Sequence, residues 1–429
     1  MFVIITVLLL LLNLSFGIPV AFSLAIAGAA GLYMFGGSQL LFGILATAPA
    51  SAISSYEFLT IPMFLLMAEF MIASRVSSSL FHAIARWTSW LPGGLGIATA
   101  LTGAAFGAIS GSSTAAAATL SSTSIPAMVD EGYERGFASG IVSIAGTLAM
   151  LIPPSIAIIF YGLLTGTSVA KLLVAGIVPG LLVTLFIIAT IWLLIWRDPS
   201  LAPSRRSYSW SERFRSLSVA GPFLGLFMLV TGLIYLGIAT PVEASALGAL
   251  GAFVFAVITD HMNWDTFKRA LLSTVLTSAM IGLIVISAQI FGFFITITQV
   301  TQNLVNFVAA HDLPPYAVML FLVVLYIVLG CFLDQLSILI LTVPVVLPVV
   351  LSLGYDPIWF GIIIILLAEV GMVTPPIGLN VYVVARNTNQ PVETVFRGVW
   401  PHVAAHILLI LTMLIFPQIV LWLPGSMGQ

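Results

Sequence analysis

The chain has 429 residues, of which 60% are hydrophobic and 7% are charged. A soluble domain this apolar would expose far more apolar surface than water tolerates, so the composition excludes that class and predicts a membrane protein. The formal net charge of −2, without a basic run, argues against a nucleic-acid partner, and the single cysteine, Cys331, excludes a disulfide framework and a multi-cysteine metal site.

The first half opens with membrane spans. Three are predicted, from Phe2 to Phe16, from Ile18 to Phe35 and from Phe58 to Ala73. The first lacks the basic start and the cleavage site of a signal peptide, so we interpret it as a helix of the mature protein. Ser77 to Trp90 follows, with apolar residues at helical spacing opposite His82 and Arg86. That pattern predicts a helix lying on the membrane surface.

The rest of the first half contains two interrupted segments and a last span. Apolar residues run to Ile109, meet Ser110-Gly111-Ser112-Ser113 and resume to Met128. Each leg is short for a full crossing of about 20 residues, which predicts a re-entrant hairpin. Gly136 to Leu163 is interrupted by Pro153-Pro154-Ser155, which predicts a broken helix. Leu172 to Trp196 is the last span of this half.

The second half has the same order of elements. Spans are predicted at Val219 to Ile238, Val242 to Ile258 and Ser278 to Thr298, a surface helix at Val300 to His311, a hairpin at Tyr316 to Leu351 with its tip at Cys331 to Asp334, a helix at Ile358 to Val384 broken at Thr374-Pro375-Pro376, and a last span at His402 to Leu423. Each half has five crossings and one hairpin that returns to its own side of the membrane. Because five is an odd number, the second half must be inverted in the membrane relative to the first.

Proline positions identify the two halves as a repeat with an offset of 222 residues. The matched pairs are Pro19/Pro241, Pro92/Pro314, Pro126/Pro348, Pro153/Pro375, Pro154/Pro376 and Pro179/Pro401. Because proline fixes φ and removes a backbone donor, matched prolines indicate matched bends and a structural duplication.

Basic residues give an independent test of this topology. If the linker from Arg197 to Arg215 is cytoplasmic, only Lys171 of the 13 lysines and arginines falls outside. The others fall inside: Arg75, Arg86, Arg135, Arg197, Arg205, Arg206, Arg213, Arg215, Lys268, Arg269, Arg386 and Arg397. This asymmetry is expected of a correct topology, and it places both termini outside.

Paired broken helices in inverted repeats are typical of secondary transporters, whose sites lie at the repeat interface. Helix N-termini at the hairpin tips favour an anionic substrate, and unwound carbonyls before each Pro-Pro pair favour a small cation. Side chains suited to both tasks lie at these interruptions: Ser110, Ser112, Ser113, Thr114, Asp334, Thr374 and Asn380. Small residues at 110–113 also fit close helix packing, and the Pro-Pro pairs also fit simple kinks.

At these interruptions the chain resembles a known family, the large membrane subunit of tripartite ATP-independent periplasmic (TRAP) transporters. The resemblance spans nearly the whole length and rests on four ordered stretches: Gly107-Ala-Ile-Ser-Gly-Ser-Ser-Thr-Ala-Ala, Gly146-Thr-Leu-Ala-Met-Leu-Ile-Pro-Pro-Ser, Gly330-Cys-Phe-Leu-Asp and Gly371-Met-Val-Thr-Pro-Pro-Ile-Gly-Leu-Asn. The chain departs from the family pattern at Ala149, usually Gly, at Gln335, usually Pro, and at Glu369, where a neutral residue is commoner.

The resemblance implies an elevator-type, Na⁺-driven importer of an organic acid in the bacterial inner membrane, working with a small four-helix membrane subunit and a periplasmic binding protein. A C4-dicarboxylate, sialic acid and other sugar or keto acids all remain open as substrates. Expected substrate-binding residues are Ser110, Gly111, Ser112, Ser113, Thr114 and Asn380. Expected Na⁺-binding residues are Ser110, Ser112, Gly146, Ala149, Leu151, Gly330, Asp334, Gly371, Met372 and Thr374.

Other functions fit the sequence less well. A stand-alone Na⁺/dicarboxylate symporter of related fold is the main alternative, although proteins of that kind usually carry Ser-Asn-Thr at the hairpin tips. An ion channel would need rings of charge along a pore, and an intramembrane enzyme would need a base beside its nucleophile or a metal site; the scattered histidines provide neither. A nucleotide-binding G-x-x-x-x-G-K-[ST] motif is absent, so no nucleotide cofactor is expected.

The predicted fold is therefore an all-α polytopic membrane protein, an inverted repeat with about 10 transmembrane helices and two re-entrant hairpins, of the elevator type of ion-transporter fold. The predicted domains are scaffold helices at 1–76, a surface arm at 77–91, a transport unit at 92–196, a cytoplasmic linker at 197–217, scaffold helices at 218–299, a second arm at 300–312 and a second transport unit at 313–429. Glu69, in the third span, fits a transport role, pairing with a partner's arginine or a position near the interface.

Overall fold

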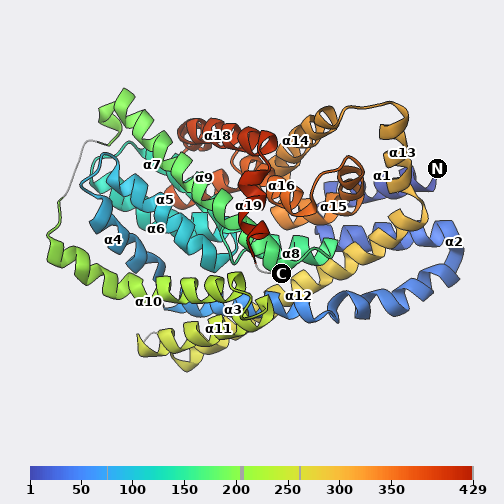
Figure 1. Ribbon diagram of the computed structural model, residues 1–429, viewed down its shortest axis with the longest axis horizontal. Coiled ribbons are helices and arrows are strands. Elements are labelled where there is room, and N and C mark those ends of the chain that lie inside the picture. Colours follow the sequence, from blue (N-terminus) through green and yellow to red (C-terminus); the bar gives the residue numbers. More distant parts are fainter. Residues whose placement is uncertain (75, 203–206, 260–261, 428–429) are drawn as a thin grey trace.

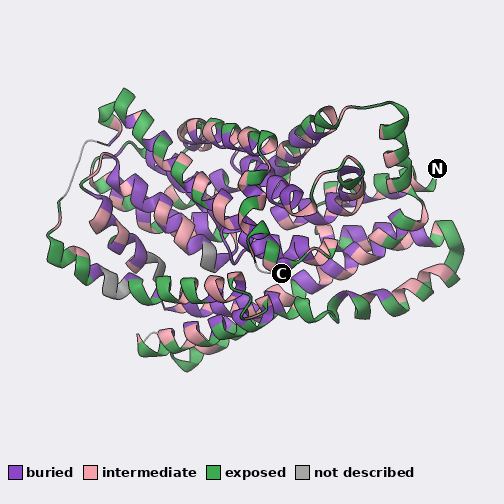
Figure 2. Cartoon of the chain, in the orientation of Figure 1, coloured by how far each residue is buried: buried purple, intermediate pink, exposed green. Residues whose placement is uncertain are grey.

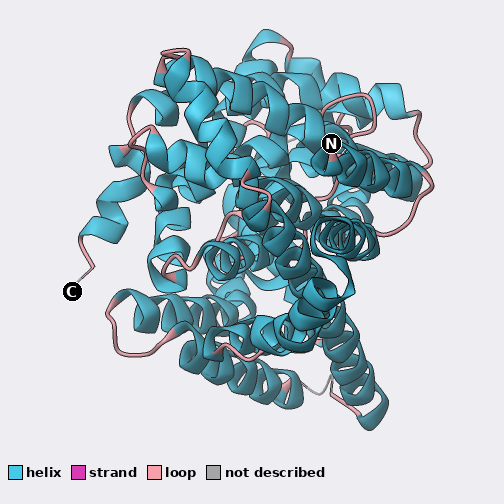
Figure 3. Cartoon of the chain, turned by 90° about the vertical axis from the view of Figure 1, so that its right-hand side faces the viewer, coloured by secondary structure: helices cyan, strands magenta, loops and turns pink. Residues whose placement is uncertain are grey.

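The computed structural model describes residues 1–74, 76–202, 207–259 and 262–427, and within them the chain is helical without a strand (Figure 3). The first half forms α1 (Phe2–Ser15), α2 (Val20–Ile53), α3 (Thr60–Ala73), α4 (Val76–Thr88), α5 (Gly94–Ser110), α6 (Ser113–Asp130), α7 (Arg135–Thr147), α8 (Ile156–Thr165) and α9 (Val169–Arg197). The second half forms α10 (Trp210–Tyr235), α11 (Pro241–Ile258), α12 (Trp264–Ile297), α13 (Val300–Ala310), α14 (Pro315–Phe332), α15 (Gln335–Ser352), α16 (Pro357–Gly371), α17 (Leu379–Thr388), α18 (Val392–Ile415) and α19 (Gln418–Gly425). Within the described ranges, 8 helices are long and apolar enough to cross a membrane.

The 222-residue offset reproduces the helix boundaries. Adding 222 carries the first residue of α6, Ser113, to Gln335, the first of α15, and the last, Asp130, to Ser352. By the same offset α4, α5, α7, α8 and α9 correspond to α13, α14, α16, α17 and α18. The duplication read from the prolines is thus confirmed, and both predicted hairpins and both broken helices are present.

The helices form two layers (Figure 1). One layer contains α2, α3, α10, α11 and α12, with α2 packed along α12 and α11 packed on α3. The other contains the hairpins, the broken helices, α9 and α18. We call the first layer the scaffold and the second the transport unit, following the sequence prediction. The helices of each layer pack mainly on one another.

Burial is concentrated in the centre of the transport unit (Figure 2). Every residue of α7 after Arg135 is buried, and so is every residue of α16 from Trp359 onward. Both helices are therefore enclosed by other helices, and the few polar side chains they carry, among them Ser143 and Glu369, are buried as well. Exposed apolar side chains lie on the scaffold helices, as at Leu250 and Leu272, and also on α9 and α14 of the transport unit, as at Leu185 and Leu320, where lipid or a partner would cover them.

Several boundaries differ from the prediction. Helix α2 continues beyond Phe35 to Ile53 after a bend at Gly36-Gly37, where Gly37 has a φ of 68°. Helix α12 begins at Trp264, well before the predicted Ser278. The missed segments are rich in small or charged residues, so their hydropathy is low. These segments are helical because α2 and α12 pack against each other, and such packing stabilises a helix more than its own composition does.

Two further boundaries were wrong. Helix α10 begins at Trp210, inside the predicted linker, because Ser209 and Glu212 form a reciprocal capping box. Helix α18 begins at Val392 and ends at Ile415, and α19 follows Pro417 as a separate helix. Three of the basic residues assigned to the cytoplasmic side, Arg75, Arg205 and Arg206, lie outside the described residues.

Candidate functional site

The tip of the first hairpin is a tight turn between α5 and α6. Gly111 has a φ of 54°, a left-handed conformation that glycine adopts without strain. Ser112 is extended and caps α6, where its Oγ accepts the backbone N–H of Ala115 at 3.4 Å and lies 3.3 Å from the Oγ1 of Thr114. The tip therefore collects hydroxyls at a helix N-terminus, where the helix dipole favours negative charge.

The tip of the second hairpin uses the equivalent residue in the same way. Asp334 stands 222 residues after Ser112 and caps α15, with its Oδ2 accepting the backbone N–H of Ser337 at 3.2 Å. The Ser337 hydroxyl donates to the other carboxylate oxygen. The repeat thus places a hydroxyl at one tip and a carboxylate at the other, and both carry lone pairs that could coordinate a cation.

The two broken helices interrupt at equivalent places. After α7, Leu148–Met150 forms one 3₁₀ turn, and Ser155 then caps α8 through its Oγ and the N–H of Ile158. After α16, the N–H of Thr374 donates to the carbonyl of Gly371, and Asn380 N–H reaches back to the carbonyl of Met372 at 3.1 Å. The peptide bonds Pro153-Pro154 and Pro375-Pro376 are both cis.

Asn380 connects the two repeats. It lies on α17 of the second repeat, is buried, and donates from Nδ2 to the Oγ of Ser113 at 2.6 Å and to the carbonyl of Ser143 at 3.3 Å. The structure therefore brings this predicted substrate residue against the first hairpin tip. Its Oδ1 is buried without a protein partner, so one acceptor remains free for a ligand or water.

Close packing accounts for the predicted glycines. A Cβ on Gly371 would lie 2.5 Å from the Cα of Gly330, and a Cβ on Gly146 would lie 2.9 Å from the Cβ of Ala117. The carbonyl of Gly371 already accepts the N–H of Thr374. These contacts explain why glycine stands at the three positions, and they leave the carbonyls of Gly146, Gly330 and Gly371 among the cation ligands proposed below. The carbonyl of Met372 accepts the N–H of Asn380 and retains a second lone pair.

Ala149 and Leu151 belong to the first break. A Cβ on Gly107 of α5 would lie 2.7 Å from the Cα of Ala149, so the hairpin packs directly on this turn. Leu151 follows and is fully buried. Ser110, at the end of α5, lies 3.5 Å through its Oγ from the carbonyl of Ser112. The residues expected for the first cation site are thus gathered around one tip and one break.

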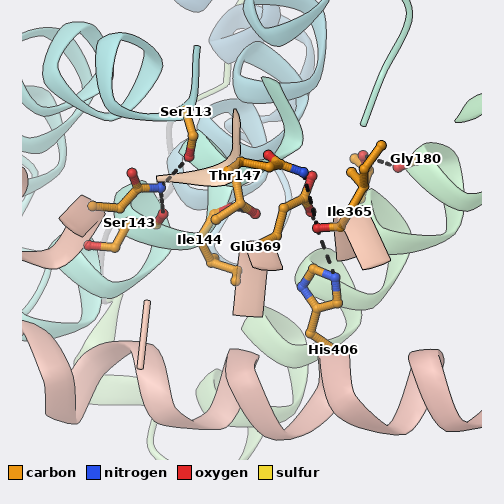
Figure 4. A network of polar contacts seen from close by, with 11 residues as sticks. Ser113, Ser143, Ile144, Thr147, Gly180, Ile365, Glu369 and His406 are labelled. Carbon is orange, nitrogen blue, oxygen red and sulfur yellow. Dashed lines mark hydrogen bonds and ion pairs between the residues drawn. The ribbon is translucent and has the colours of Figure 1, made fainter. Parts of the chain in front are cut away.

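Sequence reasoning missed a polar cluster beside this site. Glu369 on α16 and His406 on α18 are both buried, with Oε2 and Nε2 3.9 Å apart (Figure 4). Gln335, at the second tip, donates from Nε2 to the carbonyl of Ile365 on α16. The available signals were a lone carboxylate in an apolar run and two histidines, His402 and His406, one helical turn apart.

This architecture defines a class of protein. Two inverted repeats, each with a hairpin and a broken helix whose interruptions meet in a membrane-embedded core, form the fold of a secondary transporter rather than an enzyme. The comparisons with known proteins agree. The sequence profile of the family described as "Tripartite ATP-independent periplasmic transporter, DctM component" matches residues 5–419. The chain belongs to this family, the large permeases of TRAP transporters.

Relatives of known name differ in the cargo that their names state. A C4-dicarboxylate TRAP transporter large permease, DctM, of Pseudomonas aeruginosa is 33% identical over 408 residues, which cover 95% of each chain. An isethionate TRAP transporter permease, DctMQ, of Oleidesulfovibrio alaskensis is 32% identical over 417 residues, covering 95% of this chain and 64% of that relative. The family implies a tripartite system in the bacterial inner membrane, with a small membrane subunit and a periplasmic binding protein.

A solved structure supports the fold alone. The YdaH transporter of Alcanivorax borkumensis superposes with a TM-score of 0.59 over 91% of this chain and 89% of its own, at 16% sequence identity.

Proposed function

We propose that this chain is the translocating subunit of a Na⁺-coupled importer, which receives an organic acid from a periplasmic binding protein and moves it by an elevator motion. The observation that carries the proposal is the duplicated junction of hairpin tip and broken helix. Ser112 and Asp334 cap equivalent helices at the two tips, and each tip lies beside an interruption of the main chain. Duplicated junctions rich in hard oxygen atoms and poor in charge suit a monovalent cation.

We assign one Na⁺ to each junction. In the first repeat the proposed ligands are Ser110, Ser112 and the carbonyls of Gly146, Ala149 and Leu151. In the second they are Asp334, Thr374 and the carbonyls of Gly330, Gly371 and Met372. The Oγ1 of Thr374 donates to the carbonyl of Val370, which leaves its lone pairs available. A carboxylate at one site and only neutral oxygens at the other would give the two sites different affinities.

The substrate is proposed to bind at the first tip. The hydroxyls of Ser112, Ser113 and Thr114 lie at the N-terminus of α6, which favours an anion. Asn380, bonded to Ser113, offers its free Oδ1 as an acceptor to a hydroxyl group of the substrate. The relatives named for C4-dicarboxylate and isethionate support an organic acid, and this site does not distinguish among such acids.

The layered packing supports an elevator motion. The arm helices α4 and α13 join each hairpin to its scaffold neighbours, and a cavity of about 350 Å³ lies between the layers. Ser51 and Gln289 line it from the scaffold, and Leu164 and Pro344 line it from the transport unit. Space between two internally well-packed bodies permits one to slide along the other.

The proposed topology places both termini in the periplasm.

We propose that Glu69 faces the small membrane subunit. Glu69 is half-buried on α3 and accepts a hydrogen bond from the Ser273 hydroxyl of α12. A carboxylate at this depth is proposed to contact a basic side chain of the small subunit.

The test is uptake by proteoliposomes that contain this chain with its small subunit and binding protein, over a panel of organic acids, with and without an inward Na⁺ gradient. Uptake should require all three components and Na⁺, because the binding protein supplies the substrate at high effective concentration. Robust uptake by this chain alone would favour the stand-alone symporter instead. Uptake by the complete system that is indifferent to Na⁺ would overturn the proposed coupling.

A further inference from the structure

The transport unit encloses an acid–base pair outside the proposed substrate and Na⁺ ligands. Glu369 of α16 is 0% exposed and His406 of α18 is 2% exposed, and their Oε2 and Nε2 atoms lie 3.9 Å apart. Figure 4 shows the imidazole of His406 directed at the Glu369 carboxylate, with Thr147 nearby.

The pair has no other polar partner among the described residues. Both carboxylate oxygens of Glu369 and both ring nitrogens of His406 lack a hydrogen bond. The neighbouring donors are committed elsewhere, because Gln335 Nε2 donates to the carbonyl of Ile365 and Thr147 Oγ1 donates to the carbonyl of Ile144. Gln335 Oε1 is also buried without a hydrogen bond, but it is uncharged. Among the described residues, therefore, only His406 can compensate a charge on Glu369, and only Glu369 can compensate a charge on His406.

The charged groups on the surrounding helices stand at helix ends. They are Arg135 of α7, Lys171 and Arg197 of α9, Arg386 of α17, and Glu393 and Arg397 of α18. The helices packed around the pair carry six other titratable groups: Tyr161 of α8, Tyr316, Tyr326 and Cys331 of α14, Tyr382 of α17, and His402, one turn before His406. The Tyr161 hydroxyl donates to the carbonyl of Pro357, and the Tyr326 hydroxyl forms a hydrogen bond with Thr342. Within the described ranges none of them forms an ion pair or a hydrogen bond with Glu369 or His406.

The internal repeat shows that this pair is not a requirement of the fold. The equivalents of Glu369 and His406 are Thr147 and Thr184, 222 residues earlier. Thr147 and Thr184 donate to carbonyls of their own helices and need no outside partner. The same helix crossing is thus built with two neutral hydroxyls in one repeat and with an ionisable pair in the other.

A buried carboxylate without compensation costs several kcal/mol, so a dry enclosure favours a pair that is neutral as a whole. One proton achieves this, and a protonated Glu369 beside a neutral His406 is the arrangement that leaves no charge in the enclosure. We propose that Glu369 and His406 form a proton-binding site that the transport unit carries through its cycle. The proton enters from water on one side of the membrane and leaves to water on the other. That movement rests on the proposed function, whereas proton binding itself does not.

Proton binding is tested first at equilibrium, on the purified chain in lipid nanodiscs. Infrared difference spectra between high and low pH should contain the C=O band of a protonated carboxylic acid. That band should vanish in Glu369→Gln and shift in His406→Gln, and it should persist in Glu69→Gln, the matched intramembrane control. A spectrum that Glu369→Gln leaves unchanged would overturn the proposal, and this result does not depend on whether the chain transports anything.

Proton movement is tested in the complete reconstituted system with a pH dye trapped inside the vesicles. Substrate uptake should acidify the lumen, and uptake should rise by at most about tenfold per unit of external acidification, the limit for a single proton. The variant Glu369→Thr/His406→Thr copies the first repeat, so it should keep Na⁺-driven uptake and lose both the acidification and the pH dependence. His402→Gln should keep both. Equal acidification per substrate in the double variant and in the unaltered chain would refute a carried proton.

Discussion

The two tip–break junctions are built from one duplicated plan, yet they differ in enclosure. Residues 151–155 of the first break are all buried, and Ser110, Gly111 and Ser113 at the first tip are buried with them. In the second repeat Pro375, Pro376 and Ile377 are exposed, as is Asp334 at the tip. The first junction is closed over by the second repeat, whereas the second junction is open.

The contacts of the later half-helices explain part of this difference. Helix α17 lies along α6, where Asn380 bonds Ser113 and Asn387 bonds Ser121, so the second repeat reaches over the first tip. Its counterpart α8 packs on α15, but its residue equivalent to Asn380 is Ile158, which offers no side-chain hydrogen bond. Asn380, which has no polar equivalent in the first repeat, thus helps to keep the first junction closed. Symmetric sequence does not impose symmetric exposure.

The largest expected effect is at the point where the repeats cross. A Cβ on Gly398 of α18 would lie 1.9 Å from the carbonyl oxygen of Gly136 on α7. Because backbone cannot yield as a side chain does, Gly398→Leu should destabilise the chain by more than about 3 kcal/mol. The measurement is the yield of monodisperse protein and its thermal unfolding. Gly225→Leu, where the Cβ would meet open space, is the control. Equal yields for the two variants would show that the close contact of α18 with α7 does not limit stability.

Asn380→Ala should open the first junction. It removes the hydrogen bonds to Ser113 and Ser143 at a buried position, for an expected loss of about 1–3 kcal/mol in the free energy of unfolding. Asn387→Ala deletes the similar contact to Ser121 at an exposed position and should cost about 0.5 kcal/mol. Comparable losses in both variants, measured by thermal unfolding, would contradict the idea that Asn380 is the specific tie.

Na⁺ affinity should distinguish the junctions chemically. Asp334→Ala removes a carboxylate and should weaken Na⁺ binding by about tenfold, whereas Ser112→Ala removes a neutral oxygen and should weaken it by a smaller factor. Na⁺-dependent thermal stabilisation of the purified chain measures both. Ser122→Ala, on the exposed side of α6, is the control. Unchanged Na⁺ dependence in both tip variants would count against the assigned sites.

The smallest effect tests exposure directly. Ser155 and Ile377 are equivalent by the repeat, and they are 0% and 37% exposed. With Cys331 replaced by Ser, Ile377→Cys should react with a small thiosulfonate at least about fivefold faster than Ser155→Cys, because the buried site reacts only when it opens. Equal rates would show that the asymmetry is lost in the moving protein. Excess substrate should slow the reaction at 155 further if the first junction holds it.

The sequence by itself determined the class, the duplication and the positions of the hairpin tips and the Pro-Pro breaks. Matched prolines and short apolar legs report local bends and lengths, and these are properties of the chain within a few residues of each site. The hairpin tips fell where Ser112 and Asp334 were expected, and the membrane environment followed from composition alone.

Only the tertiary structure decided which interruption is covered, how far α2 and α12 extend, and that Glu369 meets His406. Each of these depends on contacts between segments far apart in the chain, which no local pattern encodes. Asn380 reaches Ser113 across 267 residues. The extra length of α2 exists because α12 supplies the surface on which it packs. Glu369 and His406 are separate features in the sequence, and the crossing of α16 with α18 makes them a pair.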